Sequence, residues 1–112
     1  YKNTIKPSIS QEALNNDVIK FYEYWKNKYL KVSKVDSTRY YIKADSTGGD
    51  SKAITNSEAM GYGMIIMSLM AGYDRDAKKY FDGLLKMYKA FPSSNNKFLM
   101  QWQINSSEKN NT

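Results

Sequence analysis

The sequence predicts an all-α chain of about three helices joined by one long loop. Apolar residues recur at steps of three and four in three separate segments, which is typical of amphipathic helices. A polar stretch containing two adjacent glycines separates the first two of these segments. With 112 residues, the chain is long enough for one compact domain.

The composition excludes several kinds of chemistry. The chain has neither His nor Cys, which excludes a Ser-His-Asp or Cys-His relay, a His-ligated metal, a disulfide framework and an iron–sulfur cluster. No cofactor and no metal site are predicted, so any catalysis must use carboxylates, hydroxyls, Lys or Arg.

Charge and hydropathy limit the partners. There are 17 Lys and Arg against 11 Asp and Glu, a net charge of +6. The Lys residues are scattered, so a solvated surface is favoured over nucleic-acid binding, which the charge alone keeps as an alternative. The longest apolar run, Met64 to Met67, is far shorter than the ~20 residues that span a bilayer.

The first helix is predicted to begin after Ser10, a good N-cap, and to run to about Tyr29. Its apolar stripe comprises Leu14, Val18, Phe21, Tyr22, Trp25 and Tyr29, with Lys20, Glu23, Lys26 and Asn27 outside it. From Val32 to Ile54 the helical pattern stops. Within that stretch Tyr40 to Ile42 is prone to form a strand, and Gly48 and Gly49 indicate a long loop.

The second helix is predicted to begin between Thr55 and Glu58 and to be buried on nearly every side. Gly61 and Gly63 interrupt it, which suggests close approach of another backbone or a ligand. Its apolar residues are Ala59, Met60, Tyr62, Met64, Ile65, Ile66, Met67, Leu69 and Met70. Three helices cannot enclose such a helix, so we expect an apolar face without a partner. Either the chain self-associates through exposed helix faces, or it is part of a larger helical assembly.

The third helix is expected to be capped by Asp74 and to end at Pro92. A short aromatic and apolar stretch, Phe98 to Ile104, follows and contains Trp102. The tail from Asn105 lacks large hydrophobic residues and is expected to be flexible. We therefore divide the chain into a folded part, 1–104, and a flexible tail, 105–112.

Glu58 allows two interpretations. Thr55 and Glu58 have the spacing of a capping box, in which the Glu side chain returns to the Thr amide. Alternatively, an apolar and aromatic setting would disfavour the charged form of Glu58, which suits a general acid. Spacing alone favours the cap.

The second helix carries a family resemblance. Its segment Ser57-Glu58-Ala59-Met60-Gly61-Tyr62-Gly63-Met64 resembles the Ser-Glu-Gly-Gln-Gly-Tyr-Gly-Met signature of glycoside hydrolase family 8. The family contains bacterial endoglucanases, chitosanases, lichenases and xylanases. The likeness extends to four further segments: Ile5-Lys6-Pro7, Met70-Ala71-Gly72-Tyr73-Asp74, Tyr80-Phe81-Asp82-Gly83-Leu84 and Leu99-Met100-Gln101-Trp102.

The resemblance implies an (α/α)6 barrel and inverting hydrolysis of β-1,4 links. It implies that Glu58 is the general acid and that Trp102, otherwise a plausible core residue, lies on the sugar-binding cleft. Tyr62 is expected beside it. The family's upstream Tyr pair corresponds approximately to Tyr40 and Tyr41, so Tyr41 is a further candidate for substrate binding.

The sequence departs from the family in two respects. Ala59-Met60 replaces Gly-Gln after the acid, and Met cannot make the hydrogen bonds of Gln. The Asp-rich motif on the base side of the mechanism does not occur, and Asp45, Asp50, Asp74 and Asp82 do not match it. The chain therefore resembles the N-terminal third of an enzyme and is expected to be inactive alone.

The leading interpretation is part of a secreted, inverting endo-β-1,4-glucanase whose partner is a β-glycan. A chitosanase or another β-glycan hydrolase of the same family is the first alternative. A non-catalytic carbohydrate-binding relic is the second, because two family features are changed or absent.

Overall fold

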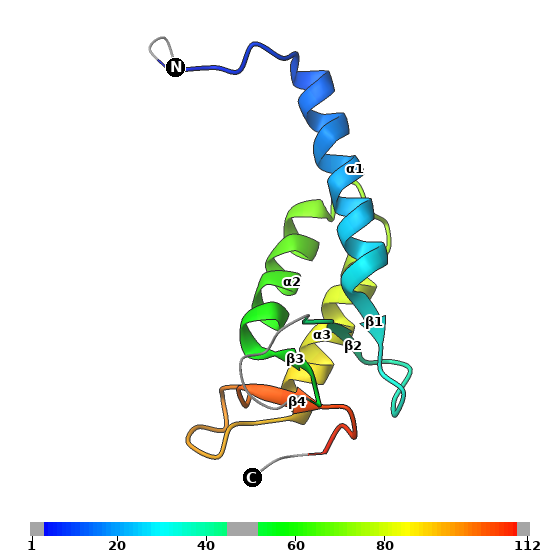
Figure 1. The fold of residues 1–112 in the computed structure, drawn as a ribbon, viewed down its shortest axis with the longest axis vertical. Coiled ribbons are helices and arrows are strands. Elements are labelled where there is room, and N and C mark those ends of the chain that lie inside the picture. The colour runs from blue at the N-terminus through cyan, green and yellow to red at the C-terminus, as the bar shows by residue number, and fades with distance from the viewer. Residues whose placement is uncertain (1–3, 45–51, 110–112) are drawn as a thin grey trace.

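The fold was analysed in a computed structural model that describes residues 4–44 and 52–109. The described residues form three helices and two pairs of short strands. Figure 1 shows that the chain is elongated, and its principal extents are 53 × 29 × 25 Å. In chain order the elements are α1 (Gln11–Tyr29), β1 (Leu30–Val32), β2 (Tyr40–Ile42), β3 (Ala53–Asn56), α2 (Ser57–Met70), α3 (Ala77–Ala90) and β4 (Gln103–Asn105).

The three predicted helices are confirmed, but the all-α prediction is only partly right. β1 pairs with β2 in an antiparallel sheet that sets Leu30 opposite Ile42. β3 pairs with β4 in a second antiparallel sheet that sets Asn56 opposite Gln103. Only β2 was indicated by sequence, because strands of three or four residues carry little periodicity. The loop predicted around Gly48 and Gly49 lies outside the described residues.

Helix α1 begins as predicted but packs over only part of its length. The Ser10 hydroxyl accepts a hydrogen bond from the Ala13 amide at 3.2 Å, which confirms the N-cap. Of its residues only Tyr22 is buried, whereas Val18 and Phe21 of the predicted apolar stripe are 56% and 70% exposed. The N-terminal half of α1 extends beyond α2 and α3 (Figure 1).

The buried face of α2 packs against β2 and α3. Gly63 is the point of close approach, because a Cβ built there would lie 2.5 Å from Ile42 Cγ1. A Cβ at Gly61 would meet nothing within 4 Å, so the predicted close approach holds at only one of the two glycines. The core residues that are buried are Tyr22, Ile42, Met60, Met67, Ala77, Leu84, Met87, Phe91, Met100 and Ile104.

The prediction that α2 is buried on nearly every side is wrong for this chain, while the expected partnerless face is present. Tyr62, Ile65 and Leu69 are 58%, 57% and 77% exposed. Their spacing of three and four residues places them along one side of the helix. Within the described part of the chain, no helix is long and apolar enough to cross a membrane.

Asp74 does not cap α3, contrary to the prediction. The helix begins at Ala77, and Asp76 occupies the cap position without a side-chain cap bond. Asp74 Oδ2 instead accepts hydrogen bonds from Tyr22 Oη at 2.6 Å and from Lys26 Nζ at 2.7 Å. Lys26, predicted to lie outside the packed face, therefore turns inward and joins α1 to the α2–α3 turn.

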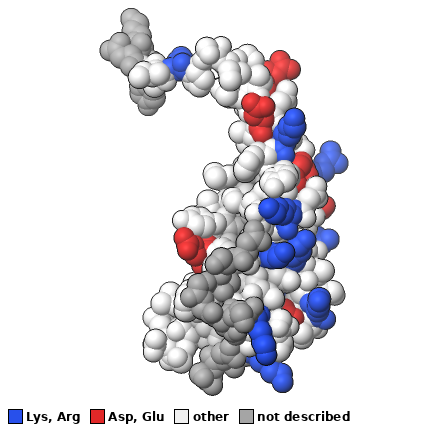
Figure 2. All heavy atoms as spheres, viewed as in Figure 1, with Lys and Arg blue, Asp and Glu red and all other residues white. Residues whose placement is uncertain are grey.

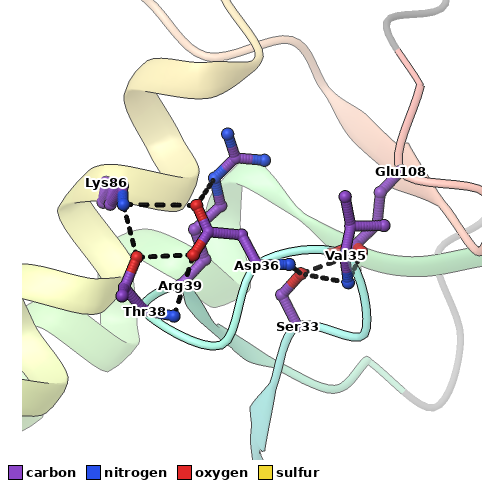
Figure 3. A network of polar contacts seen from close by, with 7 residues as sticks. All are labelled: Ser33, Val35, Asp36, Thr38, Arg39, Lys86 and Glu108. Atoms are coloured by element: carbon purple, nitrogen blue, oxygen red, sulfur yellow. Dashed lines mark hydrogen bonds and ion pairs between the residues drawn. The ribbon is translucent and has the colours of Figure 1, made fainter.

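The segment after β4 contacts the β1–β2 loop through Glu108, and the flexible tail expected over residues 105–112 stays a prediction. Glu108 Oε2 accepts hydrogen bonds from Ser33 Oγ at 2.8 Å and from the Val35 amide at 3.1 Å, as Figure 3 shows. In the same loop the Asp36 carboxylate pairs with Lys86 of α3 at 3.2 Å. The β1–β2 loop is thus held from both sides. Residues 110–112 lie outside the described part.

Candidate active site

Glu58 lies in the first turn of α2, and the structure rules out the capping box predicted for it. The N-cap is Asn56, whose Oδ1 accepts a hydrogen bond from the Ala59 amide at 2.8 Å. Thr55, the predicted cap, belongs to β3 and is fully buried.

The Glu58 side chain is exposed, so the apolar, buried setting predicted for it is absent from this chain. Within residues 4–44 and 52–109, no hydrogen bond or ion pair joins the Glu58 side chain to another residue. A carboxyl group in this position is open to a ligand at the N-terminal end of α2.

Trp102 lies next to this helix end. Its carbonyl oxygen accepts a hydrogen bond from the Ser57 amide at 2.8 Å, immediately before Glu58. Its side chain is 60% exposed, which argues against the alternative of a core residue. A flat, exposed ring of this kind offers the apolar area and polar edge that stack on sugars.

Tyr62 lies one helical turn after Glu58 and is 58% exposed. Residues four apart share a helix face, so the Tyr62 ring and the Glu58 carboxylate lie on the same side of α2. The structure therefore brings three of the predicted site residues to one end of the molecule: Glu58, Tyr62 and Trp102.

Tyr41 lies at a different place. It is half-buried in a small cavity of about 60 Å³ that Lys34, Ile54, Ser106 and Glu108 also line. Burial and the nearby negative charge of Glu108 raise the pKa of Tyr41. The residues that line this cavity do not include Glu58, Tyr62 or Trp102. Its neighbour Tyr40 packs edge-on against Tyr80 of α3, with ring centroids 5.2 Å apart.

Met60 stands where the family signature has Gln, and it is fully buried in the core. This departure therefore places a thioether in the packed interior and not on the exposed side that carries Glu58. The second departure, the missing base motif, has no substitute among the described acids. Asp74 is bound by Lys26 and Tyr22, and Asp82 pairs with Lys78 at 2.6 Å.

An apolar cavity lies apart from this site. It is an apolar groove of about 510 Å³ between α1 and the C-terminal half of α2, lined mainly by Val18, Phe21, Trp25, Ile66, Leu69 and Met70. Its one carboxylate, Asp17, has no second carboxylate beside it in the lining, so the groove offers no pair for acid–base catalysis. Self-association through such apolar faces stays a prediction.

The charged side chains are distributed unevenly over the surface. Figure 2 shows the basic side chains gathered on the side of α1 and the β1–β2 hairpin, while the surface on the α2 side is mostly uncharged. Among the residues that the structure describes, no three carboxylate side chains come together as a metal site.

Sequence reasoning missed Asn56. The signal was present, since Asn is among the preferred N-cap residues, but the Thr55–Glu58 spacing favoured a cap one residue earlier. The β3–β4 pairing decides between them, because it keeps Thr55 in an extended, buried strand.

The chain is similar to known proteins over most of its length. The sequence model described as "Glycosyl hydrolases family 8" matches residues 5–112. A protein named beta-glucanase from Niallia circulans is 45% identical over 108 residues, which are 96% of this chain and 25% of that protein. A protein named endoglucanase from Bacillus sp. (strain KSM-330) is 45% identical over 109 residues, which are 93% of this chain and 23% of that protein.

A solved structure gives the same relation. The apo structure of a beta-1,3-1,4-glucanase from Paenibacillus sp. X4 is 47% identical, with a TM-score of 0.83 over 96% of this chain and 27% of that chain. The chain thus spans about a quarter of the length of the relatives it matches, rather than the third expected from its motifs. With the family signature on α2 and a match from residue 5 to residue 112, the chain belongs to glycosyl hydrolase family 8.

Proposed function

We propose that this chain is the N-terminal part of a secreted β-glucan hydrolase in which Glu58 is the general acid. In this function Glu58 protonates the oxygen of the leaving sugar, while Trp102 and Tyr62 line the cleft that holds the glucan. The observation that carries the proposal is the exposed Glu58 carboxylate in the family signature, on a helix end whose Ser57 amide is hydrogen-bonded to the backbone of Trp102, a residue with an exposed side chain.

The proposed reaction is inverting. An inverting glycosidase uses a second carboxylate, about 6.5–9.5 Å from the acid, to activate the attacking water. No described acid of this chain fills that role, so we place the base in the part of the enzyme that the relatives have and this chain does not span. The 112-residue chain by itself is then expected to release no reducing sugar.

Glucan is the favoured substrate. The three relatives are named beta-glucanase, endoglucanase and beta-1,3-1,4-glucanase. We infer hydrolysis of β-1,4 links within such a glucan. The net charge of +6 also disfavours the cationic polymer chitosan. Tyr41 belongs to this proposal only if the complete cleft extends to the β1–β2 hairpin.

A non-catalytic carbohydrate-binding protein is the second candidate. The exposed Trp102 and Tyr62 rings favour it, because such rings can bind sugar without a pair of carboxylates. The buried position of Met60 does not favour it, since a core substitution leaves the exposed side of α2 unchanged.

The test uses the protein encoded by the complete reading frame that contains this chain. It is purified and offered carboxymethyl cellulose, mixed-linkage β-glucan and chitosan, and reducing ends are measured. Release from the glucans and little from chitosan is the expected result. Binding of glucan oligosaccharides without any release supports the non-catalytic candidate, and preferential release from chitosan supports the chitosanase alternative. If the protein neither binds glucan oligosaccharides nor releases reducing ends, both candidates are contradicted. Secretion is checked by locating the protein in the culture medium.

A further inference from the structure

We propose that Asn56 is the positioning residue of Glu58, whose side-chain cap fixes the direction in which the α2 helix presents the acid beside Trp102. This inference rests on the proposed function, because it assigns Asn56 a role in the same site.

The cap hydrogen bond closes the backbone turn that contains Glu58. Asn56 has extended backbone angles, φ −137° and ψ 169°, and its Oδ1 accepts the Ala59 amide at 2.8 Å. Glu58 lies between the two ends of this bond. The first turn of a helix leaves its amides without partners inside the helix, so a side-chain acceptor is what holds such a turn closed.

Backbone interactions with Trp102 and Gln103 hold the same turn in place. The Ser57 amide donates to the Trp102 carbonyl oxygen at 2.8 Å, and Asn56 is paired with Gln103 in the β3–β4 sheet. The backbone on the N-terminal side of Glu58 is therefore fixed by β4, and the backbone on its C-terminal side by the Asn56 side chain. Together they set Glu58 relative to Trp102.

Glu58 depends on its backbone for its direction. No hydrogen bond or ion pair from another described residue restrains its side chain. A catalytic group must be held close to its productive geometry, and a small displacement is enough to lower the rate of proton transfer. Loss of the Asn56 cap lets the turn that carries Glu58 fray, while Trp102, which directly precedes β4, keeps its place.

The alternative is a purely structural role, in which Asn56 stabilises helix α2 without affecting the position of Glu58. The chain offers a matched control for this. Ser10 caps α1 with the same kind of bond, from its Oγ to the Ala13 amide at 3.2 Å, on a helix that carries no candidate site residue. A general loss of helix capping should therefore affect the variants Asn56→Ala and Ser10→Ala in the same way.

The experiment measures kcat and KM on a soluble β-glucan for the full-length protein and its variants. All are assayed well below their unfolding temperatures, with folding checked by circular dichroism. We expect Asn56→Ala to lower kcat about tenfold with KM changed by less than about twofold. Asn56→Ser, which keeps a capping oxygen, should recover most of kcat, and Ser10→Ala should keep kcat unchanged.

The inference is overturned if Asn56→Ala has the kcat of the wild type, or if Ser10→Ala shows the same loss. It is also overturned if Asn56→Ser recovers nothing. If Asn56→Ala does not fold, Asn56→Gly replaces it, because Gly is tolerated as an N-cap but has no acceptor.

The variant Glu58→Gln separates this inference from the proposed function. Normal turnover by Glu58→Gln contradicts the role of Glu58 and with it the proposed function. Loss of turnover in Glu58→Gln together with unchanged kinetics in both Asn56→Ala and Asn56→Gly contradicts the positioning role alone.

Discussion

The two sides of helix α2 differ sharply although the sequence makes both apolar. One side carries Met60, Gly63 and Met67, which are buried against β2 and α3. The other carries Tyr62, Ile65 and Leu69, which are more than half exposed, in line with Glu58. The buried side holds this chain together, while the exposed side holds the candidate acid and has no described partner.

This difference shows what an apolar pattern does and does not predict. A helix with apolar residues on all sides indicates burial in the complete assembly, and this chain spans about a quarter of the length of its relatives. We expect the C-terminal part of the exposed side, at Ile65 and Leu69, to gain neighbours in the full-length protein, while Glu58 and Tyr62 stay open to the glucan. Substitutions on the two sides should therefore respond differently to chain length.

The largest effect on stability is expected from core truncation on the buried side. Met67 is 1% exposed, so Met67→Ala should destabilise the 112-residue chain by about 2–5 kcal/mol through lost burial and a cavity. Leu69→Ala, at a residue 77% exposed, should cost less than about 0.5 kcal/mol. Urea unfolding measures both.

The same pair of variants in the full-length protein sharpens the comparison. If the exposed side is covered there, Leu69→Ala becomes clearly destabilising. Equal, small effects of Leu69→Ala in the short and the full-length chain contradict the expectation that this side is covered.

The two glycines of α2 provide the next largest contrast. Gly63→Ala places a methyl group 2.5 Å from Ile42 Cγ1 and should destabilise the fold by about 1–3 kcal/mol. Gly61→Ala meets nothing within 4 Å and should stabilise α2 by up to about 1 kcal/mol. Thermal unfolding of the two variants compares them. Equal shifts of the midpoint would mean that β2 does not approach α2 at Gly63.

A smaller effect is expected at the hydrogen-bonded joint formed by Tyr22, Lys26 and Asp74, which ties α1 to the turn after α2. Burial by itself would raise the pKa of Asp74, but hydrogen bonds from Lys26 and Tyr22 outweigh it and hold that pKa below its usual value. Tyr22 Oη also contacts Met67 Sδ at 3.4 Å, so the joint reaches the core. Asp74→Asn should cost about 1–2 kcal/mol at neutral pH.

The pH dependence follows from the sign of that shift. Because the folded-state pKa is lowered, the ionised Asp74 stabilises the folded state above its unfolded pKa of about 4. This stability is lost as the pH falls through the folded-state pKa. Urea midpoints measured from about pH 5 down to about pH 2 should therefore fall less steeply for Asp74→Asn than for the wild type. If the urea midpoints of the wild type and Asp74→Asn fell in parallel with pH, the stabilising role of the ionised Asp74 would be contradicted.

The sequence predicted elements that depend on local signals. Ser10 and the helix that follows it, the apolar pattern of α2 and the stripe of α3 are all local, and the structure confirms all three helices. The strand tendency of Tyr40–Ile42 was also visible. The family assignment came from a contiguous motif around Glu58 and is confirmed over residues 5–112.

What the sequence missed depends on contacts between distant segments. The β3–β4 sheet, which moves the α2 cap from Thr55 to Asn56, joins segments far apart in the chain. Asp74 was expected to cap α3, but Lys26 and Tyr22 of α1 take its carboxylate. Glu108 holds the loop at Ser33 in the same long-range way. Local patterns carry no record of such partners.

The role of Glu58 is tested most directly by one rate measurement. Glu58→Gln in the full-length protein keeps the shape of the side chain but removes the proton donor. We expect the initial rate of reducing-end release from mixed-linkage β-glucan to fall by about 100-fold or more, with oligosaccharide binding retained. A rate within about twofold of the wild type would contradict the assignment of Glu58 as the general acid.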